Sequence, residues 1–275
     1  MNEIIIEPGR TEANYWRDLW RFRELFGFLA WRDILVRYKQ TAVGVAWAVL
    51  RPFLTMLVFV AIFSRVAGLA STAMPYSIMV LAGMLPWQFF ATALSEAGSS
   101  LVTNSNLITK IYFPRIILPA SSVIVALVDF AITLGLLAAL MLWHQYVPSW
   151  RIVFLPAFIL LSLVAALGPG LLITALNVKF RDFRYIIPFV VQFGLYVSPV
   201  GFSSEVIAQR FGENARMLYA LNPMVGVIDG FRWCIGDATA FHPASFVISA
   251  VFSLVLLWLG IRYFRNTEKT FADVI

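Results

Sequence analysis

Long apolar runs alternate with short polar segments over most of this chain. A helix needs about 20 apolar residues to cross the hydrocarbon core of a bilayer, and six runs approach or exceed that length. The pattern predicts an all-α integral membrane protein with six transmembrane helices, and an even number places both termini on one side. The runs lie near Pro52–Ala70, Ile78–Leu101, Ile116–Trp143, Ile152–Leu176, Ile186–Phe202 and Phe246–Tyr263.

The second and third apolar runs are separated by a polar segment, Asn104-Ser105-Asn106-Leu107-Ile108-Thr109-Lys110-Ile111-Tyr112-Phe113-Pro114-Arg115. Hydrocarbon does not tolerate polar backbone or a short isolated helix, so the segment is expected at a membrane face. The pattern predicts a short helix at about residues 104–113. Its apolar side chains, Leu107, Ile108, Ile111 and Tyr112, are expected to stay exposed. Since an exposed apolar patch marks an interaction site, the helix is expected to contact a partner.

The residues before the first run predict further helical segments. In Tyr15–Leu29, aromatic and charged residues alternate at helical spacing. This is typical of an amphipathic helix in the headgroup layer, and a soluble helix packed on a partner is the alternative. Trp31–Arg51 is richer in charge and leads into Pro52, which suits the first position of a helix. We therefore divide the chain into an N-terminal region, residues 1–51, and a single transmembrane domain, residues 52–275.

A region of intermediate polarity, about residues 203–243, lies between the fifth and sixth runs. It is too long for a turn and too apolar for a disordered loop. Within it, Arg216–Ile235 holds two apolar segments separated by Asn222-Pro223, which predicts a helix, a break and a second helix. The region is too short for two further spans. We therefore predict a re-entrant helical hairpin before the last span.

Composition supports the membrane class, and the charges indicate an orientation. Of the 275 residues, 60% are hydrophobic and 13% are charged, with a mean hydropathy of +0.81. Most of the 21 Lys and Arg residues lie before the first run, in the polar segment, after the fourth run and in the tail of about residues 264–275. The positive-inside rule makes these regions cytoplasmic. The basic excess therefore reflects orientation rather than nucleic-acid binding.

The sequence offers little for enzyme chemistry. It has no phosphate loop of the G-x-x-x-x-G-K-[ST] type and no G-x-S-x-G motif. Cys234 reads as a packing residue, and His144 and His242 as interfacial polar residues rather than metal ligands. Two carboxylates, Glu96 and Asp129, fall in or near apolar runs. With no basic residue at its depth, Asp129 is expected to be protonated or hydrogen-bonded to Ser and Thr of a neighbouring helix; part of a proton relay is the alternative.

Five short blocks occur in a recognisable order. They are Arg32–Thr41 with Gly44 and Trp47; Leu107–Lys110 with Phe113-Pro114 and Leu118-Pro119; Arg181-Asp182-Phe183; Ser198-Pro199-Val200; and Leu221-Asn222-Pro223-Met224 with Phe231-Arg232. Together they resemble the membrane subunit of type-2 ABC exporters, in particular the permeases that export O-antigen, teichoic acid or capsule. No single block is specific, but their order over residues 32–232 covers most of the chain.

The resemblance implies a homodimer of six-span subunits in the bacterial inner membrane, with both termini cytoplasmic. Two separate ATP-binding subunits would hold ATP and Mg²⁺, so this chain would bind no cofactor or metal and would not be an enzyme. The cargo would be an undecaprenyl-diphosphate-linked glycan, such as an O-antigen, that passes between the protomers within membrane lipid. A permease for teichoic acid, capsule, drugs or lipids is the nearest alternative. A proton-coupled carrier and a membrane glycosyltransferase are more distant ones. No nucleic-acid partner is implied.

The resemblance also implies sites that face the ATP-binding subunits. The polar segment would be the coupling helix seated in the ATPase cleft, and a second cytoplasmic loop follows the fourth span. The coupling residues are Asn106, Leu107, Ile108, Lys110, Ile111 and Tyr112, and those of the second loop are Lys179, Arg181 and Asp182.

Two further sets of residues are predicted to meet the cargo. Trp31, Tyr38 and Trp47 should hold three basic residues at headgroup depth, where arginine binds phosphate oxygens by bidentate hydrogen bonds. Ordinary charges that touch anionic lipid are the alternative. The basic residues are Arg37, Lys39 and Arg51, and the rings predicted to line the channel from the first and fifth spans are Phe59, Phe63, Phe193 and Tyr196.

Overall fold

The computed structural model describes residues 15–39, 44–66, 74–180, 182–236 and 241–271, and every regular element in these ranges is helical. The first half contains α1 (Tyr15–Arg21), α2 (Arg23–Lys39), α3 (Gly44–Phe59), its π-helical continuation Val60–Val66, α4 (Tyr76–Thr103), α5 (Ser105–Lys110) and α6 (Ile117–Trp143). The second half contains the 3-10 turn Trp150–Phe154, α7 (Leu155–Lys179), α8 (Phe183–Val197), α9 (Glu205–Phe211), α10 (Glu213–Tyr219), α11 (Pro223–Ile235), α12 (Pro243–Thr267) and the 3-10 turn Glu268–Thr270.

Five helical stretches in the described residues are long and apolar enough to span a membrane, so the all-helical membrane fold is confirmed. They are Ala46–Phe63, Tyr76–Thr103, Ile117–Trp143, Trp150–Lys179 and Pro243–Thr270. The helix expected as the fifth of six spans, α8, has only 15 residues. The count of six spans and the re-entrant placement of residues 203–243 therefore stay predictions.

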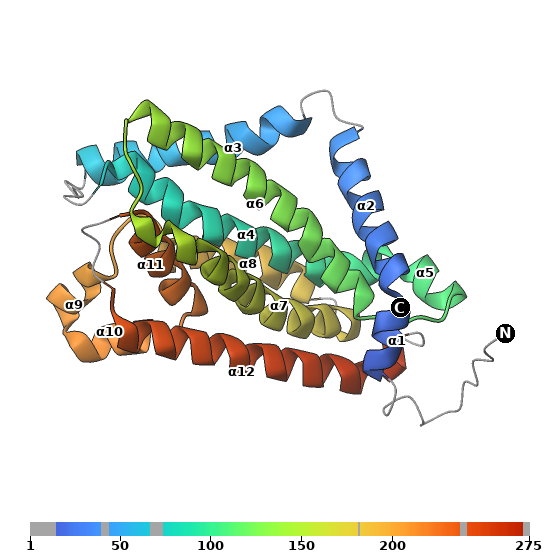
Figure 1. The fold of residues 1–275 in the computed structure, drawn as a ribbon. Coiled ribbons are helices and arrows are strands. Elements are labelled where there is room, and N and C mark those ends of the chain that lie inside the picture. The colour runs from blue at the N-terminus through green and yellow to red at the C-terminus, as the bar shows by residue number, and fades with distance from the viewer. Residues whose placement is uncertain (1–14, 40–43, 67–73, 181, 237–240, 272–275) are drawn as a thin grey trace.

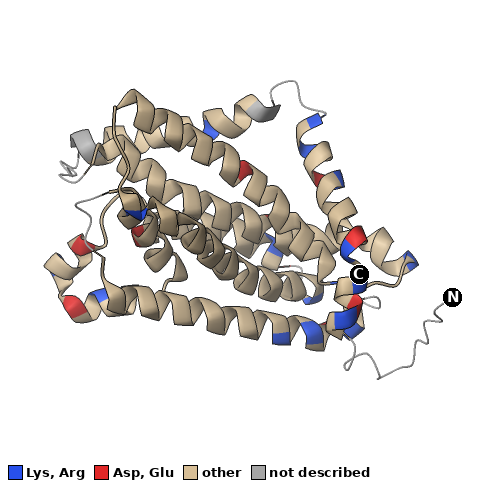
Figure 2. Ribbon diagram, in the orientation of Figure 1, with Lys and Arg blue, Asp and Glu red and all other residues tan. Residues whose placement is uncertain are grey.

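The long helices α4, α6, α7 and α12 run beside one another, with α1, α2 and α5 at one end and α9 and α10 at the other (Figure 1). We call these the α5 end and the α9 end. The centre of the bundle is α4, which packs on α6, α7 and α11. Of its apolar window 78% is buried, against 17% for α3. Figure 2 shows most of the charged residues toward the two ends, with charged positions also along α3 and α6, whereas long stretches of α7 and α12 are uncharged. The chain is thus a packed helical bundle.

The helices α7 and α12 cross at two glycines. A Cβ atom built on Gly260 would lie 2.3 Å from the backbone oxygen of Gly168, and one built on Gly168 would lie 2.6 Å from the backbone nitrogen of Leu257. Small residues at a crossing let two membrane helices approach closely without the hydrophobic drive available in water. The α7 and α12 backbones are therefore held in direct contact.

Two expectations for the N-terminal part are corrected. The amphipathic helix does not end near Leu29 but continues to Lys39, because Phe22 and Phe26 bond to the carbonyls of Asp18 and Phe22 across the break between α1 and α2. Nor is Pro52 a first helical residue, since it lies inside α3. Interior proline is tolerated in membrane helices because neighbouring groups can satisfy the freed backbone oxygen.

The region before the last span contains the predicted break, since α10 ends at Tyr219 and α11 begins at Pro223. The Asn222 side chain caps α11 by accepting from the Met224 N–H at 3.0 Å. An additional helix, α9, precedes these two. Most of α11 is buried against α4, α7 and α12, so α11 belongs to the core of the bundle.

Arg232, in α11, is a buried cation inside the bundle. Its side chain is only 3% exposed. The guanidinium donates to the carbonyl oxygens of Val200 at 2.6 Å, Phe202 at 2.8 Å and Met79 at 3.2 Å. Val200 and Phe202 lie in the non-helical segment after α8, residues 198–202, where their oxygens lack helical partners, whereas Met79 lies within α4. Arg232 thus supplies donors to this segment inside the bundle. We call this contact the Arg232 anchor.

Candidate functional site

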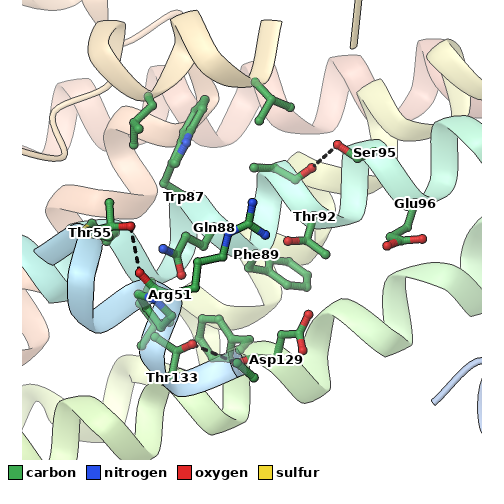
Figure 3. A pocket seen from close by; sticks show the side chains of 18 of the residues that line it. Arg51, Thr55, Trp87, Gln88, Phe89, Thr92, Ser95, Glu96, Asp129 and Thr133 are labelled. Atoms are coloured by element: carbon green, nitrogen blue, oxygen red, sulfur yellow. Dashed lines mark hydrogen bonds between the residues drawn. The ribbon is translucent and has the colours of Figure 1, made fainter. Parts of the chain in front are cut away.

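A pocket of about 820 Å³ lies between α2, α3, α4, α6 and α8 (Figure 3). Figure 3 shows Arg51, Thr92, Glu96 and Asp129 around one hollow. The lining thus combines both signs of charge with hydroxyl, amide and aromatic groups. Polar members are Arg37, Tyr38, Arg51, Thr55, Gln88, Thr92, Ser95, Glu96, Asp129, Thr133 and Gln192, and the rings include Trp47, Trp87, Phe89 and Phe130.

An ion-pair network joins the N-terminal helix α2 to the spans. Arg37 lies 2.7 Å from an Asp129 oxygen and 3.1 Å from a Glu96 oxygen. The Tyr38 hydroxyl donates to the Asp129 carboxylate, and burial together with this bond raises the pKa of Tyr38. The expectation that Asp129 has no basic partner is therefore wrong, because α2 folds back onto α6 and brings in a cation that is distant in the chain.

Of the three basic residues predicted at headgroup depth, two line the pocket and one does not. Arg37 and Arg51 both line the pocket, whereas Lys39 is exposed at the end of α2 and is not part of the lining. Among the described residues, no hydrogen bond or ion pair involves the guanidinium of Arg51, which lies one turn before Thr55 on α3. Arg51 is therefore the lining cation best able to meet an anionic ligand.

Four aromatic side chains form a stripe along α8. Tyr185, Phe189, Phe193 and Tyr196 are 78%, 58%, 56% and 63% exposed, and the rings of Phe189 and Phe193 lie 4.4 Å apart. Their spacing of three and four residues puts them on one face of the helix. Phe193 and Tyr196 were predicted; Tyr185 and Phe189 were missed, although the same spacing indicates them. We call these four side chains the aromatic stripe.

The aromatic residues predicted from the first span lie elsewhere. Phe59 is only 6% exposed, and its ring lies 5.4 Å from that of Phe63. Both rings pack against Gly201, because a Cβ atom built there would lie 3.0 to 3.1 Å from them. They fill space between α3 and the segment after α8 in the protomer, so they do not share a surface with the aromatic stripe.

The polar segment forms the short helix α5 at one end of the bundle, and its residues divide into two sets. Ile111 and Tyr112 are 55% and 47% exposed, as expected, and Asn106 and Lys110 are also exposed. Leu107 is partly buried. Ile108, predicted to be exposed, is 5% exposed and belongs to an apolar cluster with Leu101, Phe113, Phe264 and Phe271. Ile108 is buried because it lies on the face of α5 that packs against this cluster.

The loop after α7 lies at the same end. Val178 belongs to the apolar cluster that contains Ile108. Lys179 is exposed and its amine lies 5.4 Å from the centre of the Phe180 ring, while Asp182 is an exposed residue just before α8. Arg181 lies outside the described residues. The two predicted loops thus share one end of the molecule.

Comparisons with known proteins cover nearly all of the chain. The family model described as ABC-2 type transporter matches residues 24–236. The chain is 30% identical over 260 residues to the O-antigen export system permease protein RfbA of Myxococcus xanthus, which covers 94% of this chain and 98% of the relative. An RfbA protein of Klebsiella pneumoniae is 24% identical, over 89% and 92% of the two chains. The polysialic acid transport protein KpsM of Escherichia coli is 22% identical, over 86% and 91%.

Proposed function

This chain belongs to the ABC-2 type transporter family, and we propose that it is the permease subunit of a transporter that exports a lipid-linked polysaccharide of the O-antigen kind. ATP hydrolysis takes place on a separate subunit. Three relatives named as O-antigen export permeases support this cargo, and the more distant KpsM relatives are named for another polysaccharide. The absence of a phosphate loop from the sequence agrees with an ATPase on another chain.

The observation that carries this proposal is the aromatic stripe on α8. Four exposed rings over about 16 Å of helix give a long surface on which the C–H faces of sugars can stack. Since the chain is a packed helical bundle, we place the glycan path between two copies of this chain related by a two-fold axis, the commonest closed symmetry. The stripes of the two copies would then line the path, with α8 as the fifth of six spans.

We further propose that the pocket receives the diphosphate of an undecaprenyl-linked glycan. Its volume of about 820 Å³ falls in the ordinary range of ligand pockets. Arg37 is already paired with Glu96 and Asp129, whereas Arg51 offers a guanidinium that matches phosphate oxygens in geometry and charge. Arg51 is therefore assigned as the main phosphate contact, with the cytoplasmic leaflet of the inner membrane as the source of the lipid.

This assignment predicts that Arg51→Gln lowers export by about tenfold or more, as expected for the loss of a hydrogen bond to a charged group. Export is measured as glycan delivered across membrane vesicles that contain the permease, the ATPase subunit and a lipid-linked glycan. Lys39→Gln is the matched control, because it removes a cation of the same region that lies outside the pocket. Equal export by the two variants would contradict the role of Arg51 and leave both charges as orientation signals.

A second prediction concerns the ATP-binding partner, which we place at the α5 end. Replacing Ile111 and Tyr112 by Asp puts two charges on the apolar surface that would enter the ATPase cleft. We expect the ATPase subunit no longer to co-purify with the permease. Asn266→Asp is the control, because it adds negative charge at an exposed polar position of the α5 end, on α12 and outside the polar segment. Ile108→Asp is not a test of this surface, because Ile108 is buried and a charge there would disturb the fold. Unchanged co-purification would exclude the surface of Ile111 and Tyr112 from the interface with the ATPase.

A further inference from the structure

The polar segment of residues 104–115, which we call the coupling segment, is joined to the start of the C-terminal tail by reciprocal hydrogen bonds. Arg115 lies between α5 and α6, and Glu268 directly follows α12. The backbone N–H of Arg115 donates to the Glu268 carboxylate at 2.6 Å, across 153 residues of sequence. The Arg115 guanidinium in turn donates to the backbone carbonyl of Glu268. We call this pair the Arg115–Glu268 clamp.

The clamp is partly buried, and apolar and aromatic residues flank it in sequence. Phe264 and Phe271, on either side of Glu268 in sequence, are at most 1% exposed, and their rings meet edge to face at 5.3 Å. They share one apolar cluster with Phe113 and Ile108 from the coupling segment. A charge-assisted hydrogen bond is stronger when it is shielded from water. The clamp is therefore partly shielded from water, unlike a fully exposed ion pair.

The N-terminal helix reaches the same point. The Arg265 guanidinium lies 4.7 Å from the centre of the Tyr15 ring, and Figure 1 shows α1 beside the C-terminal end of α12 and near α5. Three segments distant in sequence, α1, the coupling segment and the tail, thus meet around Glu268.

The clamp connects α5 to helices that the chain itself does not join to it. The covalent chain links α5 to α4 and α6 only. Through Glu268 the coupling segment also holds α12, and α12 contacts α7 backbone to backbone at Gly260 and Gly168. A displacement of α5 would therefore be transmitted to α4, α6, α12 and α7 together. By contrast α3, whose window is 17% buried, and one face of α8 are largely exposed and contribute little to this set of contacts.

We propose that Glu268 is a positioning residue for energy coupling, which makes the last span move as one body with the coupling segment when the ATPase displaces it. This inference rests on the proposed function, because it requires an ATP-binding partner at α5. Glu268 acts through Arg115 and touches neither cargo nor nucleotide. Without the clamp the ATPase can still bind and hydrolyse ATP, but its motion reaches α12 poorly.

The functional test uses the complete complex, permease and ATPase, in vesicles. Glu268→Ala is expected to lower the glycan exported per ATP hydrolysed by about tenfold, while co-purification and ATP hydrolysis stay at wild-type levels. Glu268→Gln keeps an acceptor oxygen for the Arg115 N–H and should recover much of that ratio. Glu24→Ala, which removes an exposed carboxylate at the same end, is the control. An unchanged ratio in Glu268→Ala, or a parallel loss of ATPase binding, hydrolysis and export, would overturn the proposal.

A structural readout separates this proposal from the proposed cargo, because it needs no glycan. Spin labels at Asn106→Cys on α5 and Asn266→Cys on α12 report the distance between the two helices, and both positions are exposed while Cys234 is buried. With ATP and vanadate, the wild-type distance is expected to match the nucleotide-free one, and Glu268→Ala should shift or broaden it. A wild-type distance that changes with nucleotide would overturn the clamp. A permease that never binds the ATPase would instead overturn the proposed function.

Discussion

Arg232→Ala is expected to destabilise the protein by about 3–5 kcal/mol, the range seen when a buried charged contact loses one partner. The substitution removes the guanidinium that donates to the carbonyl oxygens of Val200, Phe202 and Met79. Each oxygen left unsatisfied in a buried site carries a desolvation penalty of about 1–3 kcal/mol. Asp229, which interacts electrostatically with Arg232, would also lose its compensating cation. The measurement is the thermal unfolding midpoint of the purified permease in detergent.

Two comparisons make this prediction specific. Arg210→Ala, at an exposed position in α9, should leave the midpoint nearly unchanged. Arg232→Lys should be intermediate, because an ammonium keeps the charge but cannot spread its donors as a planar guanidinium does. A midpoint for Arg232→Ala equal to that of Arg210→Ala would contradict the structural role of the Arg232 anchor.

Gly260→Leu is expected to have a comparable effect on folding, at about 3 kcal/mol or more. Its Cβ atom would lie 2.3 Å from the Gly168 carbonyl oxygen. Because the obstacle is backbone, no rotamer change relieves the clash, and α7 and α12 must separate along their whole crossing. Loss of the monodisperse peak in size-exclusion chromatography of the detergent-solubilised protein measures the effect.

The control for Gly260 is another glycine within a long apolar helix. Gly135, in α6, has no neighbouring atom within 4 Å of a built Cβ, so Gly135→Leu introduces the same side chain without a clash. It should elute as the wild-type protein does. If the two leucine variants behave alike, the α7–α12 crossing is looser than its geometry indicates.

The long buried helices were predictable because membrane thickness fixes their length. The second and third runs, predicted at Ile78–Leu101 and Ile116–Trp143, correspond closely to α4, Tyr76–Thr103, and α6, Ile117–Trp143. The end of the fifth run was not predictable, because the apolar residues continue to Phe202 whereas α8 ends at Val197. There Ser198 is extended and precedes proline, so hydropathy alone counted two backbone conformations as one helix.

The parts of the candidate site that could be predicted are those whose residues all lie on one helix. The four rings of the aromatic stripe follow one another at helical spacing within α8. Phe193 and Tyr196 were predicted to line a channel, and that role stays a prediction. The Arg37–Asp129 pair and the Arg232 anchor join side chains from distant parts of the chain. No local pattern reports such contacts, because a charge in sequence looks the same whether it meets lipid, water or a buried carbonyl. The burial of Ile108 escaped for a similar reason, since its partners lie on α4 and in the tail.

The shortness of α8 bears on the lipid at the mouth of the proposed path. Its 15 residues extend about 22 Å, well under the hydrocarbon thickness of about 30 Å. A bilayer beside so short an apolar helix adjusts to the hydrophobic mismatch by thinning. Local thinning brings the two headgroup layers closer together next to the pocket. If α8 is a span, as proposed, the diphosphate of a lipid-linked cargo would cross less hydrocarbon here than beside a helix of full length.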